Sequence, residues 1–167
     1  MVEFYFNALD YYFMTSRNNE MAMLDVTAGW SRTGNVIHVT NSAVQTGAVG
    51  LRRYYFDQVA VKKTRGSHFY TLVPAEQATL QALNSGNTEV AGLPFDEGID
   101  AYAFPPAVEG VGGSCGSGQT PVYRLFRGQT RFPDNPNHRF TTNVNLYNSF
   151  VALGWDGEGV KFCAPTP

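Results

Sequence analysis

The sequence predicts a mainly β domain with short helices, in which three strand-strand-helix-strand repeats surround an approximate threefold axis. Three observations lead to this prediction. One order of patterns recurs three times along the chain, which identifies an internal repeat. Charged residues make up only 16% of the chain and aromatic residues 14%, and 17 glycines and 9 prolines are available for turns. This composition is typical of short strands joined by loops, and 167 residues suit one domain covering residues 1–167.

The first unit covers about residues 2–39. Aromatic residues that alternate with others predict strands at 2–6 and 10–15, and a helix-like stretch follows at 18–24. Gly29-Trp30 then predicts a turn, because glycine is a common turn residue, and residues 36–39 are expected to form the closing strand.

The second unit covers about residues 51–104 and contains the clearest helix, at 74–83. Pro74 stands in the first turn of this helix, where its missing N–H costs no hydrogen bond, and Gly86 follows the end. A longer loop at 87–94 replaces the Gly-Trp element of the first unit. The expected strands cover residues 51–56, 67–71 and 99–104.

The third unit covers about residues 121–165 and restores the Gly-Trp element as Gly154-Trp155. Its expected strands and helix cover residues 122–126, 137–142, 144–153 and 160–165. A unit of about forty residues is too small to bury its own apolar face, so the three copies must pack together. A β-trefoil-like arrangement is one way to do this, and an irregular α+β arrangement of hairpin-helix units is the competing prediction.

Two motifs resemble a bacterial repeat domain of unknown function. One is Ser67-His68-Phe69-Tyr70-Thr71, and the other runs from Gly154-Trp155 through Glu158-Gly159 to Ala164-Pro165. The resemblance covers nearly the whole chain, and it implies a secreted or cell-surface protein in which such repeats often follow a catalytic or adhesive domain. The first unit departs from the family pattern, because Tyr11 stands where the family usually has histidine.

Cys115 and Cys163 are the two cysteines of the chain. Cys115 lies in a Gly/Ser-rich linker, where a free thiol would be exposed, and Cys163 ends the last strand pattern. We expect a disulfide, since closing a loop of about fifty residues stabilises by roughly 4 kcal/mol on the loop-entropy description. Such a bond implies an oxidising compartment. Two unrelated thiols in a cytosolic protein are the alternative.

The net charge and the hydropathy of the chain limit the classes of partner and the cellular locations that we expect. The net charge of −2 gives no electrostatic reason to bind nucleic acid, and no apolar run is long enough to cross a bilayer. The start, Met1 to Phe4, lacks the basic segment of a signal peptide, which fits a methionine placed before a mature sequence. We therefore expect a secreted monomer, extracellular or periplasmic, without membrane insertion and without a cofactor.

Aromatic side chains next to polar ones are the candidate ligand contacts. A flat ring covers the apolar face of a sugar, and neighbouring polar groups bond its hydroxyls. Trp30 and Trp155 both stand in glycine-flanked segments, where a side chain can face solvent. The competing interpretation places each tryptophan in the core, as a plug that seals its repeat. The candidate ligand-binding residues are Trp30, Arg32, Trp155, Asp156, Glu158 and Asp134.

The sequence supports a catalytic site or a metal site less strongly than it supports ligand binding. Acidic residues cluster at Asp96, Glu97 and Asp100, and again at Asp156 and Glu158, but turns before a closing strand favour such residues anyway. The histidines of the two matching second strands, at 68 and 138, are expected to bridge strands by hydrogen bonds, with a metal site or a catalytic base as alternatives.

Three functions follow from these observations. The first is a non-catalytic module that binds carbohydrate or a cell-surface polymer. The second is a small secreted hydrolase of the glycosidase type that uses acidic residues. The third is a structural or adhesive domain that contacts other proteins.

Overall fold

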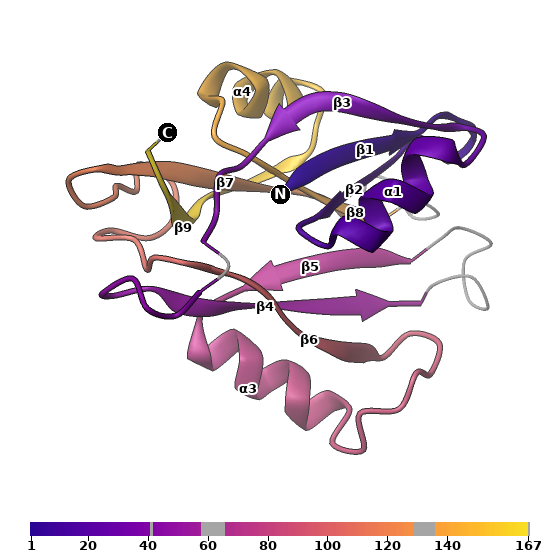
Figure 1. Cartoon of the computed structure of the whole chain (residues 1–167), viewed down its shortest axis with the longest axis horizontal. Helices are drawn as coiled ribbons and strands as arrows, with labels where there is room; N and C mark the ends of the chain where they lie inside the picture. Colours follow the sequence, from indigo (N-terminus) through magenta and orange to yellow (C-terminus); the bar gives the residue numbers. More distant parts are fainter. Residues whose placement is uncertain (41, 58–65, 129–135, 167) are drawn as a thin grey trace.

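The computed structural model describes residues 1–40, 42–57, 66–128 and 136–166, which contain three three-stranded sheets (Figure 1). Unit one consists of β1 (Val2–Phe6), the 3-10 turn η1 (Asn7–Leu9), β2 (Tyr11–Thr15), α1 (Asn18–Val26) and β3 (Trp30–Val36). Unit two consists of β4 (Val49–Phe56), β5 (Ser67–Thr71), α3 (Pro74–Leu83) and β6 (Pro94–Ala103). Unit three consists of β7 (Gln119–Arg127), β8 (Asn137–Thr141), α4 (Val144–Ala152) and β9 (Asp156–Pro165).

The predicted fold class is confirmed. Within the described ranges the chain is mainly β, and each unit has the order strand, strand, helix, strand. In every sheet the first strand of the unit lies in the middle and pairs antiparallel with the other two, giving the orders β2-β1-β3, β5-β4-β6 and β8-β7-β9. The repeated sheets and helices form a trefoil-like arrangement.

The register of the strands defines which residues are equivalent. The second residues of the three second strands are Tyr12, His68 and His138, and their first residues are Tyr11, Ser67 and Asn137. Tyr12 therefore takes the place of the two histidines in unit one. The alignment of Tyr11 with them was wrong by one residue, because β2 begins after a left-handed residue, Asp10, that ends η1.

Gly29 lies in the predicted turn, but the strand that follows begins at Trp30 and covers residues 30–36, which corrects the expected strand at 36–39. Trp30 is the first residue of β3 and pairs with Phe6, and Arg32 pairs with Phe4. Gly29 has φ 88°, and a Cβ at this position would lie 2.7 Å from the Phe6 ring. Glycine is therefore required where the chain turns onto the sheet.

Each helix follows a threonine that ends the second strand. The hydroxyl oxygens of Thr15, Thr71 and Thr141 each accept a bond from the backbone N–H two residues later, at 3.0, 2.9 and 3.0 Å. Such local bonds favour a turn out of a strand. In α4, Asn143 also caps the helix, because its side chain accepts from the N–H groups of Asn145 and Leu146.

The main core contains side chains from all three units. Met14, Tyr70 and Phe140 hold equivalent positions in the second strands and are all buried in it. The Tyr70 ring meets the edge of Phe140 with centroids 5.4 Å apart, and its hydroxyl donates to the Met14 carbonyl at 2.5 Å. No unit could shelter these side chains alone, so the units fold against one another.

A ring of hydrogen bonds joins the second strands around the approximate threefold axis. The Tyr11 hydroxyl lies 3.0 Å from His68 Nδ1, and the Ser67 hydroxyl lies 3.0 Å from His138 Nδ1. The ring closes where Asn137 accepts from the Tyr12 N–H at 2.8 Å and donates to the Tyr12 carbonyl at 3.0 Å. The predicted bridging role of both histidines is confirmed, and the bridges connect different units.

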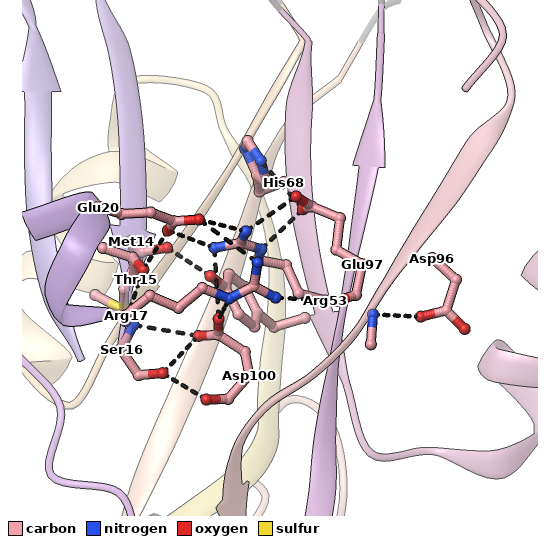
Figure 2. Close-up of polar contacts among 12 residues, drawn as sticks. Met14, Thr15, Ser16, Arg17, Glu20, Arg53, His68, Asp96, Glu97 and Asp100 are labelled. Atoms are coloured by element: carbon pink, nitrogen blue, oxygen red, sulfur yellow. Dashed lines mark hydrogen bonds and ion pairs between the residues drawn. The ribbon is translucent and has the colours of Figure 1, made fainter. Parts of the chain in front are cut away.

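A buried arginine links unit one to unit two (Figure 2). Arg53 of β4 is 1% exposed and donates to both oxygens of Glu20 in α1, at 2.7 Å each. It also donates to both oxygens of Glu97 in β6, at 2.8 and 2.9 Å. Figure 2 shows the guanidinium between these two carboxylates. Such bidentate pairs are stronger than single hydrogen bonds and also fix the relative orientation of the two side chains.

The junction between units two and three repeats this arrangement. Arg124 of β7 donates to both oxygens of Glu76 in α3, at 3.1 and 2.9 Å, and to both oxygens of Glu158 in β9, at 2.7 and 3.0 Å. The acidic residues at 97 and 158 therefore lie inside strands as partners of buried arginines, which corrects their assignment to turns.

At the junction between units three and one the positions of the acidic residue and the arginine are exchanged. Glu3 occupies the position of Arg53 and Arg124, and it accepts from Arg139 of β8 at 2.8 Å on each oxygen. Leu146 stands in α4 where the other helices have a glutamate. Arg139 itself replaces Phe13 and Phe69 of the other second strands, so the arginine of this junction lies on the second strand instead of the middle strand.

The expected disulfide is present between Cys115 and Cys163, which are 48 residues apart in the sequence. The linker after unit two lies along β9, because Gly110 exchanges backbone bonds of 2.9 Å with Val160. The bond therefore ties this linker to the last strand, beside the buried Phe104.

We expect the double variant Cys115→Ser/Cys163→Ala to lower the free energy of unfolding by about 2–5 kcal/mol. The reason is the greater conformational entropy of the unfolded chain once the 48-residue loop is open. Urea denaturation of the variant and of the wild type measures the loss. Wild-type protein in excess reductant should match the variant, and equal stability of all three samples would contradict the prediction.

We expect Arg139→Leu to cost about 3–5 kcal/mol of stability, because it leaves the Glu3 carboxylate buried without its partner. The double variant Glu3→Leu/Arg139→Leu should cost less than the sum of the two single substitutions. A double-mutant cycle by chemical denaturation measures the coupling. Simple additivity would show that the pair does not act as a unit.

Candidate binding pocket between units one and two

A pocket of about 400 Å³ lies where unit one meets unit two. Its walls come from β2, α1 and β3 on one side and from β4, β5 and β6 on the other. Two carboxylates and an imidazole stand among aromatic and aliphatic side chains. The lining residues are Tyr11, Phe13, Met23, Leu24, Thr27, Trp30, Tyr55, Gly66, His68, Glu89 and Glu97.

Trp30 forms the centre of the aromatic wall. Its ring lies 5.1 Å from the Phe6 ring and meets Tyr11 and Phe13 edge-on, with centroids 6.0 and 6.3 Å away. These contacts leave the indole only partly buried. Because β3 holds it against β1, the indole has a fixed orientation before any ligand arrives.

His68 joins the two walls of the pocket. Its Nδ1 lies 3.0 Å from the Tyr11 hydroxyl, and its Nε2 lies 3.4 Å from Glu97 Oε2. The imidazole also packs against Phe13 and Tyr55, with centroids 4.5 and 4.8 Å away. Burial lowers the pKa of His68, and the Glu97 carboxylate opposes this lowering only in part. The imidazole is thus held between a hydroxyl and a carboxylate.

Glu97 remains ionised over a wide pH range. Its burial raises the pKa, but the hydrogen bonds and charges of His68 and Arg53 outweigh burial and lower the pKa to about 2. Its oxygens accept bonds from Arg53, and the residue lines the pocket. Glu97 is therefore a hydrogen-bond acceptor in this pocket and not a proton donor.

Two of the residues predicted from the sequence lie near this pocket, but only Trp30 lines it. Arg32 is exposed on β3 and pairs through two bonds of 2.7 Å with Asp25 of α1. Its guanidinium lies over the Phe4 ring, 5.4 Å from the centroid, and does not reach the pocket walls.

Trp155 has the opposite environment to Trp30. It is 6% exposed and buried in a cluster with Leu125 and Tyr147, and it meets Tyr12 and Phe150 edge-on. The Arg127 guanidinium covers the indole at 4.9 Å from its centroid. This tryptophan is the core plug of the alternative interpretation, because rings and a cation already cover its faces.

The remaining predicted contacts belong to unit three. Asp156 is exposed at the start of β9, and Glu158 is bonded to Arg124. Asp134 lies outside the described residues. The structure therefore does not bring Trp155, Asp156 and Glu158 together with Trp30 at one site.

Several residues of the pocket were missed as ligand contacts. Tyr11, Tyr55 and Glu89 come from three different elements or loops, and nothing in their spacing along the chain indicates that they meet. His68 and Glu97 were noted for other roles. The one usable signal was the repeat itself, since equivalent positions in neighbouring units must face each other around a threefold axis.

In the described part of the chain, no group of three or more His, Cys, Asp or Glu side chains could hold a metal ion. No helix among those residues is long and apolar enough to cross a membrane.

Comparison with known proteins gives a family match. Residues 1–165 match the family described as "Domain of unknown function (DUF5648)". Neither a search of curated proteins nor a search of solved structures found a match.

We expect acid to destabilise the fold first through its buried histidines. Burial, with a smaller contribution from the Arg124 charge, lowers the pKa of His138 to about 3, below the ordinary value of 6.5. The unfolded chain therefore binds the extra proton first, and stability falls as the pH drops below 6.5 by about 1.4 kcal/mol per pH unit for each such group. Glu97, with its lowered pKa, adds a further loss only as the pH falls from about 4.5 toward 2.

The variant His138→Asn should show a shallower loss of stability between about pH 6 and pH 5, reduced by about 1.4 kcal/mol per pH unit. Urea denaturation at several pH values measures this slope. An unchanged slope would show that His138 is protonated as readily in the folded chain as in the unfolded chain.

Proposed function

Because this chain belongs to the DUF5648 family, whose description assigns no function, we propose from its own geometry that it is a non-catalytic module that binds carbohydrate or a cell-surface sugar polymer. We further propose that it belongs to a secreted bacterial protein. The disulfide between Cys115 and Cys163 supports this compartment, since such bonds persist in oxidising surroundings.

One observation carries the proposal: a partly buried tryptophan shares an open pocket with hydroxyl, imidazole and carboxylate groups. The pocket of about 400 Å³ is within the size range of sites for small ligands. The Trp30 indole supplies flat apolar surface, which suits the C–H face of a pyranose.

Directional contacts in this pocket are available at its polar wall. Glu97 accepts hydrogen bonds and cannot donate them at neutral pH, because its pKa is about 2. Thr27 and Glu89 line the rim and offer a hydroxyl and a second carboxylate. Sugar hydroxyls are good donors to such groups, so ring stacking and hydrogen bonding can act on one ligand.

The same geometry argues against glycoside hydrolysis at this site. A glycosidase needs one carboxylic acid with a raised pKa beside a second carboxylate. Glu97 has a lowered pKa instead, because Arg53 and His68 stabilise its charge. Glu158, the equivalent residue of unit three, is likewise bonded to Arg124.

A glycan array that includes bacterial and plant cell-surface polysaccharides tests the proposed class of ligand. Saturable binding of the intact chain to one or a few glycans is the expected result. Turnover of a glycoside or an ester would favour the hydrolase instead. Capture of proteins without any dependence on sugar would favour an adhesive domain.

We expect Met23→Arg to weaken glycan binding at least about tenfold, a loss of about 1.4 kcal/mol. Met23 is 58% exposed on α1 and lines the pocket, so a long charged side chain obstructs the site without disturbing the core. Val26→Arg is the matched control, because Val26 is on the same helix, 85% exposed and outside the pocket. Isothermal titration calorimetry measures both.

Trp30→Ala should cause a similar loss, with Tyr102→Ala as the aromatic control outside the pocket. Thermal unfolding of each variant separates lost binding from lost folding. Binding that survives both Met23→Arg and Trp30→Ala in folded protein would place the ligand elsewhere.

A further inference from the structure

We propose that the junction between units two and three is a second carbohydrate site, equivalent by the approximate threefold symmetry to the first. This inference rests on the proposed function for its class of ligand. A hollow of about 410 Å³ lies at this junction, and its lining residues are Phe69, Ala75, Glu76, Thr79, Leu80 and Arg124.

Three of these residues repeat part of one wall of the first pocket, on the helix side, whereas unit two has no counterpart of Trp30. Phe69 holds the same position in β5 as Phe13 does in β2, two residues before the threonine that ends the strand. Both helices begin three residues after that threonine, so Thr79 and Leu80 of α3 correspond to Met23 and Leu24 of α1. The two hollows therefore share a phenyl ring and the same face of a helix.

The environment of the phenyl ring is also repeated. The Arg124 guanidinium lies over Phe69, 4.4 Å from its centroid, as Arg53 lies over Phe13 at 5.7 Å. His138 meets the Phe69 ring edge-on with centroids 5.0 Å apart. Phe69 is nevertheless only partly buried, so a rigidly held ring remains accessible to a ligand.

The charges at this hollow favour an uncharged sugar. Glu76 and Arg124 are joined by bonds of 2.9 and 3.1 Å, and Lys161 lies 3.9 Å from Glu76. The carboxylate and the guanidinium thus compensate each other within the lining. The remaining contacts are Phe69 and Leu80 for the apolar face of a sugar ring and the Thr79 hydroxyl oxygen, which donates to the Ala75 carbonyl and can accept from a sugar hydroxyl.

The third junction is filled by the protein itself. Arg139 replaces the phenyl ring, and its guanidinium lies between Tyr12 and Phe150, at 4.0 and 4.2 Å from their centroids. Trp155 meets the same two rings edge-on. Among the described residues, the first two junctions each offer a hollow, and a polymer that reaches both would bind more tightly than a single sugar unit.

An NMR titration tests this inference. The ¹⁵N-labelled chain is titrated with three uncharged probes, the β-1,4-linked hexamers of glucose, N-acetylglucosamine and mannose. For at least one hexamer we expect saturable shifts of two sets of amide signals, one around Trp30 and one around Phe69 and Thr79.

Thr79→Arg should remove the second set, or weaken it at least tenfold, and leave the first set unchanged. Thr79 is exposed on α3, so the substitution obstructs the hollow without removing core packing. Ala78→Arg is the matched control, since Ala78 is exposed on the same helix and does not line the hollow. Met23→Arg should have the reverse effect on the two sets.

The possible outcomes separate the two proposals. Shifts around Trp30 alone, or a second set that Thr79→Arg does not change, would overturn the second site and leave the first. Shifts around Phe69 alone would support the second site and overturn the assignment of the first. No saturable shift at Phe69 and Thr79 with any hexamer would overturn the second site.

Discussion

The burial of one charged pair at every junction between units is the constraint on which this fold depends. Arg53, Arg124 and Glu3 occupy one position in the middle strand of their sheets, and each forms an ion pair with a side chain from the preceding unit. A buried charge without its partner is costly, so no unit can leave its neighbour without losing these bonds. The pairs also fix the walls of the candidate pocket, since Arg53 holds Glu97 in place and Glu97 in turn contacts His68.

Much of the architecture could be predicted from the sequence because the repeats carry local signals. The helix at 74–83 was placed correctly, since Pro74 at its start and Gly86 after its end act within a few residues of the chain. The disulfide could also be inferred, because Cys115 and Cys163 were the only two cysteines available. Even so, the boundaries of β3 were displaced, because the pairing of Trp30 with Phe6 is not visible in local pattern.

The candidate site could be predicted only in part because its contacts join residues of different units. Trp30 and Trp155 stand in the same Gly-Trp motif, yet one lines a pocket and the other is enclosed by Tyr12, Phe150 and Arg127. Part of their difference arises from the next unit in the ring, which contributes Tyr55 and His68 to the pocket of Trp30 but Tyr12 to the surroundings of Trp155. A motif read within one repeat carries no information about that neighbour.

At the third junction the acidic residue and the arginine have exchanged strands. The side chains at the junctions therefore determine the order in which the units pack around the axis. A homotrimer of unit one would set Glu3 beside Glu20, two carboxylates with no guanidinium between them, and a homotrimer of unit three would set Arg124 beside Leu146. Unit two alone carries both halves of a complete junction, Arg53 and Glu76. It also carries Ser67 and His68, the two residue types that form one link in the ring of hydrogen bonds around the threefold axis. Among the three fragments, this middle one is the natural template for a symmetric protein assembled from identical copies of a single short chain.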